Sequence, residues 1–170
     1  MVLVVVFWLV LISGVLHILE ETLTGWVSWF QRHIPSMSAR QFWIVNALFL
    51  LLCVTALMVN AALPLFSLSV AALIAINGFI HIRNSVRERR YTPGLVTAIF
   101  LYQPVAVMTY LVYAMAGLLP LPTFLGSLLL GVMWMLVVIL IVSWHSRTVS
   151  SLADKNNLHN RFNNESNIYE

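Results

Sequence analysis

The stretch VLVVVFWLVLISGVLHILEE, residues 2–21, decides the fold. Apart from Ser13 and its last ionisable residues the stretch is apolar, and it is long enough to cross a bilayer, because about 20 helical residues span the hydrocarbon core. It closes with His17, Glu20 and Glu21, whose spacing of three and four residues places them on one helix face. Each ionisable group at this depth costs about 3 kcal/mol on insertion scales. These three side chains therefore need partners from other parts of the chain.

Composition assigns the rest of the chain to the same class. Of 170 residues, 61% are hydrophobic and only 9% are charged, whereas ordinary soluble domains carry about 25% charged residues. The apolar runs are continuous, so they do not show the alternation of β-barrel strands. Nothing basic precedes the first run, as a signal peptide would require, so we expect it to remain as the first span. The sequence predicts an all-α, polytopic membrane helix bundle.

Five apolar runs are long enough to be transmembrane helices. Their predicted bounds are about 2–21, 42–62, 65–84, 95–117 and 122–144. A four-span bundle, in which one run is dropped or fused, is the alternative. We expect one membrane domain over residues 1–146 and a disordered, polar cytoplasmic tail over 147–170.

The basic residues predict the orientation. In a five-span arrangement all nine of them fall on one side of the membrane, namely Arg32, Arg40, Arg83, Arg87, Arg89, Arg90, Arg147, Lys155 and Arg161. The positive-inside bias makes that side cytoplasmic, with the N-terminus outside and the C-terminus inside. We therefore expect a multi-pass protein of the cytoplasmic (inner) cell membrane, and the net charge of +3 reflects this topology rather than binding of nucleic acid.

The same topology brings polar residues from four spans to one depth. The first span ends at its cytoplasmic side with the His/Glu group, and Asn46 lies about one turn into the second span. Asn77 and His81 lie near the cytoplasmic end of the third span, and Thr97 begins the fourth. Random placement would not usually produce this agreement. It predicts a common site near the inner leaflet.

These residue types favour a divalent metal. His17 and His81, with Glu20 or Glu21, form the two-histidine, one-carboxylate set of many zinc and non-haem iron sites. The remaining glutamate would act as a general base. Asn77, four residues before His81, is expected to fix the His81 ring, with Asn46 and Thr97 supporting the site.

Two other readings of the cluster stay open. The His and Glu side chains could pair with one another as structural contacts between helices. Alternatively, Arg83 or Arg87 could neutralise the glutamates in ion pairs.

The segment Arg87-Glu88-Arg89-Arg90-Tyr91-Thr92-Pro93-Gly94 suits an anion. Thr92 is the expected N-cap and Pro93 the first residue of the fourth span, so the free N–H groups of a helix start would lie beside the arginines. A phospholipid headgroup or a phosphorylated substrate could bind there. The residues assigned to this site are Arg83, Arg87, Arg90, Thr92 and Gly94. Topology charges and a helix cap are the simpler alternative.

Other features predict how the bundle packs. Trp26 and its aromatic neighbours indicate a short amphipathic segment in the headgroup region. Small residues in the third span predict a central position for it. Pro104 should distort the fourth span, and Gln103 beside it needs a polar partner at membrane depth.

Three motifs carry a family resemblance. They are His17-x-x-Glu20-Glu21, Asn77-x-x-x-His81 and Tyr91-x-Pro93-Gly94-x-x-Thr97. In this order they resemble the HXXEE family of small membrane proteins, over about residues 5–115. The resemblance implies a shared membrane site built from the motif residues, and membrane-embedded enzymes are suspected in this family.

The preferred hypothesis is a membrane enzyme at the cytoplasmic interface that hydrolyses or otherwise transforms a lipidic or amphipathic substrate. Glu20, Glu21 and Tyr91 would be the catalytic residues, with Tyr91 stabilising an anion. A metal-free His/Glu acid–base reaction is a close variant. The alternatives are a transporter of protons, metal ions or small solutes, which should show polar residues through the full membrane depth, and a non-catalytic assembly partner.

Overall fold

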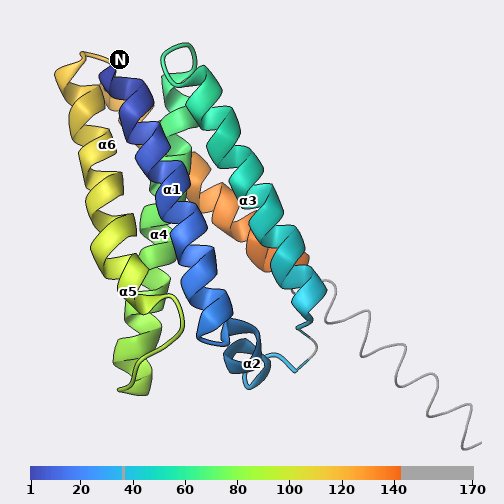
Figure 1. Cartoon of the computed structure of the whole chain (residues 1–170). Coiled ribbons are helices and arrows are strands. Elements are labelled where there is room, and N and C mark those ends of the chain that lie inside the picture. The colour runs from blue at the N-terminus through green and yellow to red at the C-terminus, as the bar shows by residue number, and fades with distance from the viewer. Residues whose placement is uncertain (36, 143–170) are drawn as a thin grey trace, which may run out of the picture.

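The computed structural model describes residues 1–35 and 37–142, and the regular elements in these stretches are all helices (Figure 1). The labelled elements are α1 (Val2–Leu23), α2 (Trp26–Gln31), α3 (Ala39–Val59), α4 (Pro64–Glu88), α5 (Leu95–Thr97), the π-helix η1 (Ala98–Tyr102) and α6 (Gln103–Met115). A last helix, Leu121–Val142, follows α6.

Five helices are long and apolar enough to cross a membrane: α1, α3, α4, the continuous segment Leu95–Met115 and the helix Leu121–Val142. The predicted all-α, five-helix fold is confirmed, and the chain has the character of a multi-pass membrane protein. The polar tail predicted for residues 147–170 lies outside the described residues.

Helix α4 lies at the centre of the bundle, as its small residues predict. In the most apolar 18 residues of α4, 56% are buried inside the bundle, compared with 17% in the corresponding stretches of α3 and of the last helix. Ser67, Ala71 and Ala72 are buried, and they allow close approach of neighbouring helices. A Cβ atom on Gly131 of the last helix would lie only 2.6 Å from the Ala72 Cβ atom. Small residues on both helices are therefore required at this crossing.

Helix α4 is longer than predicted at its C-terminal end. The predicted topology counts Arg83 and Arg87 with the loop that follows the third span, whereas both lie on the last turns of α4, which continues to Glu88. An apolar run marks only the part of a helix that lies in hydrocarbon, and the helix itself can continue into the headgroup region. The described arginines still gather at one end of the bundle, where α1 ends and α3 begins.

The fourth span contains the distortion expected from Pro104. Residues Ala98–Tyr102 form one π-helical segment directly before α6, because Pro104 has no N–H to continue the regular hydrogen bonding. Gln103 finds its polar partner across the bundle, donating from Nε2 to the Ala75 carbonyl at 2.8 Å. This segment packs on α4 and α1 and turns Tyr102 into the interior.

Candidate metal centre

Two helices bring three buried ligands together at the arginine-rich end of the bundle. His17 and Glu21 lie one turn apart on α1, and His81 lies on α4. One potential ligand atom from each residue lies within 4.8 Å of the others. The Glu21 Oε1 atom is 3.6 Å from His17 Nε2 and 3.3 Å from His81 Nε2. The predicted convergence of these residues is found, with exposures of only 1%, 5% and 5% for His17, Glu21 and His81.

Hydrogen bonds fix which nitrogen of each histidine faces the cluster. His81 Nδ1 lies 2.8 Å from the Pro93 carbonyl oxygen, which can only accept, so Nδ1 donates. His17 Nδ1 lies 2.7 Å from Thr97 Oγ1. The Thr97 hydroxyl gives its single proton to the Glu20 carboxylate, so His17 Nδ1 must also donate. Both rings therefore turn Nε2 towards Glu21, and in the neutral form of each ring this atom carries the free lone pair.

Asn77 completes this arrangement through a partner that differs from the expected one. Its spacing predicts contact with His81, but its Nδ2 atom lies 3.3 Å from His17 Nε2 on the neighbouring helix. His81 is instead oriented by the Pro93 carbonyl. Residues four apart share a helix face, but the tilt of α1 against α4 decides which side chain each one reaches.

The two adjacent glutamates have different surroundings. Glu20 is not a member of the ligand cluster and accepts four hydrogen bonds: from the Tyr91 hydroxyl at 2.8 Å, the Val96 N–H at 3.0 Å, and the Thr97 N–H at 2.7 Å and hydroxyl. Both of its oxygens are thus engaged. The sequence leaves open which glutamate joins the histidines, and the structure selects Glu21, while Glu20 orients His17 through Thr97.

Glu20 also occupies the helix start that the sequence assigns to an external anion. The free N–H groups at the beginning of the fourth span point at this carboxylate. Thr92 is not the N-cap: Gly94 takes that position, with φ of 87°, and the Thr92 side chain is fully buried against the His81 carbonyl at 3.4 Å. The turn at Gly94 shifts the helix start by two residues relative to the prediction.

Gly94 lies directly against the two histidines. A Cβ atom at this position would be 2.8 Å from His17 Cε1 and 2.8 Å from His81 Cε1, closer than non-bonded carbon atoms approach. The absence of a side chain is therefore required both by the left-handed backbone and by the imidazole rings. Gly94 therefore forms part of the wall of the His/Glu cluster.

Tyr91 lies outside the membrane-spanning helices and closes the cluster from the loop. Burial raises the pKa of its phenol, and the hydrogen bond to Glu20 acts in the same direction. The phenol therefore stays protonated at neutral pH and remains a donor. Its contact in this structure is Glu20, which places it beside the Glu20–Thr97–His17 chain of hydrogen bonds.

The arginines lie apart from the buried cluster. Arg83 and Arg87 are exposed, and in the described part of the chain neither pairs with a carboxylate, so the reading in which they neutralise the glutamates is wrong for these residues. Arg90 pairs with Glu88 at 2.7 Å. The Trp29 indole also donates to Glu88, at 3.2 Å, which ties α2 to the end of α4.

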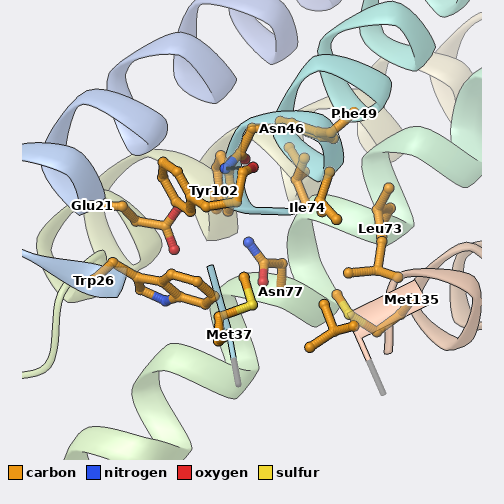
Figure 2. A pocket seen from close by; sticks show the side chains of 14 residues that line it. Glu21, Trp26, Met37, Asn46, Phe49, Leu73, Ile74, Asn77, Tyr102 and Met135 are labelled. Carbon is orange, nitrogen blue, oxygen red and sulfur yellow. Dashed lines mark hydrogen bonds between the residues drawn. The ribbon is translucent and has the colours of Figure 1, made fainter. Parts of the chain in front are cut away.

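An apolar cavity of about 110 Å³ adjoins the cluster. Figure 2 shows Glu21, Asn46, Asn77 and Trp26 on one side of it, and Leu73 with Met135 on the other. Asn46 is thus on the cavity wall, and its Nδ2 atom donates to the Phe42 carbonyl at 3.0 Å. Trp26, which belongs to the segment predicted to lie in the headgroup region, lines the cavity as well.

Sequence reasoning missed Tyr102. Its ring stacks on His17, with centroids 4.2 Å apart, it is 1% exposed, and it also lines the cavity. The available signal was a tyrosine inside an apolar span two residues before Pro104. A π-helical segment often marks a functional position, but its presence is decided by packing.

The fold and this centre define a class of protein: a multi-pass helix bundle with a buried His/Glu cluster that could hold a metal ion. The model of the family described as "Protein of unknown function with HXXEE motif" matches residues 8–109. The chain belongs to this HXXEE family. No curated protein and no solved structure matches it.

Proposed function

We propose that this protein is a metal-dependent membrane enzyme that hydrolyses a lipidic or amphipathic substrate, with the metal held by His17, Glu21 and His81. The observation that carries the proposal is the orientation of the two imidazoles. Both Nδ1 atoms are committed as donors, so two lone pairs and a carboxylate oxygen converge on one buried point. Such a set suits a cation between its members, and a divalent metal could be bound by all three.

The hydrogen bonds behind the ligands support this assignment. Metal-binding histidines commonly donate their other N–H to a carboxylate or a carbonyl, which fixes the ring and raises its basicity. The Pro93 carbonyl does so for His81, and the Thr97 hydroxyl, backed by Glu20, does so for His17. Zinc and non-haem iron both accept two histidines and one carboxylate.

A divalent metal held by these three residues would supply an activated water, because such metals lower the pKa of water to about 7. In hydrolysis, the water oxygen forms a bond to the acyl carbon and the bond from that carbon to the leaving group breaks. One water proton passes to the leaving group, and the other is released as the acid ionises. Because the cavity begins at Glu21, an apolar substrate would reach the centre from that side.

Enzymatic function is favoured over transport by the rest of the bundle. The buried polar groups farther from the cluster are held by backbone carbonyls: Ser13 bonds to Val10, Thr109 to Val105, and Ser67 to Ala56. In the described part of the bundle they form no chain of ionisable groups across the membrane. The arginine-rich end that carries the centre is assigned to the cytoplasmic face by the positive-inside bias.

Metal analysis of the purified protein tests the proposal. We expect the wild type to retain one Zn²⁺ per chain after passage over a desalting column, and His81→Ala and Glu21→Gln to retain none. His33→Ala, which removes a half-exposed histidine, is the matched control and should keep the metal. A wild type that binds no metal, or variants that bind it as well as the control, would contradict the assignment.

Hydrolysis is tested in the same preparations with p-nitrophenyl laurate in proteoliposomes. We expect p-nitrophenol release that a chelator abolishes, that Zn²⁺ or Fe²⁺ restores, and that His81→Ala lacks. Activity that survives both the chelator and the His81 substitution would refute metal-dependent hydrolysis. Protein that binds metal but shows no activity would support the metal site and contradict the enzymatic function.

A further inference from the structure

We propose that the cavity beside the His/Glu cluster binds the uncharged head and the adjoining methylene groups of a single acyl chain, the head carrying a carbonyl and a hydroxyl, as in a monoacylglycerol. This inference rests on the proposed function, because it names the class of substrate that the centre would receive. It is carried by the distribution of polar and apolar groups around the cavity (Figure 2).

One end of the cavity suits a hydrocarbon chain. Its wall there includes Leu73, Ile74 and Met135 (Figure 2), contributed by α4 and the last helix. Apolar walls with a few placed polar groups are typical of ligand sites. Methionine is flexible and adapts to chains of different shape. These side chains offer no hydrogen bond to a ligand, so this end of the cavity favours methylene groups.

The other end offers hydrogen bonds that the protein does not use. Tyr102 is 1% exposed, and among the hydrogen bonds of residues 1–35 and 37–142 none involves its hydroxyl. Buried tyrosine hydroxyls usually find a partner. Asn46 and Asn77 donate through Nδ2 to Phe42 and His17, and within the same residues their Oδ1 atoms accept no hydrogen bond. One donor and two acceptors therefore line this end.

These groups specify the head of the ligand. The Tyr102 hydroxyl needs an acceptor such as an ester carbonyl, and the two amide oxygens need donors such as hydroxyl groups. Glu21 is the only carboxylate among the residues that line the cavity, and no lysine or arginine is among them. In the metal-free protein, a carboxylate or phosphate head would lie beside Glu21 without a compensating cation, which disfavours an anionic head there.

Native mass spectrometry of the chelator-treated, metal-free protein released from detergent tests the inference. The probes are 1-monolauroylglycerol, laurate and 1-lauroyl lysophosphatidate, which share one chain length and differ in the head. We expect a one-to-one complex with monolauroylglycerol. The two anions should bind about tenfold more weakly, because their heads leave buried hydrogen-bonding groups of the cavity without a partner. Equal or tighter binding of either anion would overturn the assignment of an uncharged head.

Two matched substitutions on α3 test the location. Val45→Trp adds an indole at the cavity wall, and Leu48→Trp adds the same group on the exposed side of the helix, where Leu48 is 47% exposed. Val45→Trp should abolish the monolauroylglycerol complex, and Leu48→Trp should keep it. Retained binding in Val45→Trp would place the ligand elsewhere and overturn the inference.

Metal content separates this inference from the proposed function and reports folding of the Val45→Trp variant. Metal-loaded wild type that binds no monolauroylglycerol would overturn the cavity assignment alone. Wild type that binds monolauroylglycerol without binding metal would support the cavity assignment and refute the metal-dependent function. A Val45→Trp variant that keeps its metal but loses the ligand would support both.

Discussion

Replacing Gly94 with alanine should disrupt the metal centre through a single methyl group. The added carbon would lie 2.8 Å from a ring carbon of each histidine and 2.9 Å from His81 Nδ1. Neither ring can simply retreat, because each Nδ1 is held by a hydrogen bond, to Thr97 for His17 and to Pro93 for His81. The methyl group therefore acts on both ligands at once.

The expected cost has two parts that can be separated. A left-handed backbone costs an alanine about 1–2 kcal/mol, and overpacking a filled site costs about 1–3 kcal/mol more. Gly25 has a similar φ of 75°, compared with 87° at Gly94, and nothing lies within 4 Å of its would-be Cβ atom. Gly25→Ala should therefore show the backbone cost alone.

The two variants are compared in unfolding and in metal binding, in the same detergent. We expect Gly94→Ala to lose about 1–3 kcal/mol more unfolding free energy than Gly25→Ala. Its Zn²⁺ affinity should fall by about 10–100-fold, the range seen when the support of a ligating histidine is lost, while Gly25→Ala keeps wild-type affinity. Equal losses in the two variants would refute the reasoning that the histidine rings fill this space.

Two further changes test the support of the site and the packing of the bundle. Thr97→Val leaves the His17 Nδ1–H without an acceptor and should lower Zn²⁺ affinity by about 10–100-fold. The control Thr109→Val removes a buried hydroxyl that is bonded within its own helix, and it should leave the Zn²⁺ affinity unchanged. Equal effects of the two substitutions would contradict the role of Thr97. Gly131→Ala places a methyl group 2.6 Å from Ala72 and should destabilise the protein by about 1–3 kcal/mol. Gly126→Ala meets only the flexible end of Leu65 and should cost less in the same unfolding assay; the reverse order would contradict the close helix crossing.

Much of the fold is encoded locally, and the sequence by itself determined it. Continuous apolar runs of about 20 residues specify membrane helices regardless of their neighbours, so five spans and their order could be read directly. The depth of the polar residues also followed, because alternating helix direction places the end of one span beside the start of the next. His17 and Glu21 share a face for the same local reason, being one turn apart.

Only the tertiary structure decided the roles within the site. Glu20 and Glu21 are adjacent and chemically identical, and they differ because the turn at Gly94 carries the Val96 and Thr97 N–H groups to Glu20 across more than 70 residues of sequence. The π-helix that turns Tyr102 onto His17 likewise depends on packing against α4. Helix periodicity fixes faces within one segment, whereas the contacts that select a ligand arise between segments and depend on their tilt and on the loops that join them.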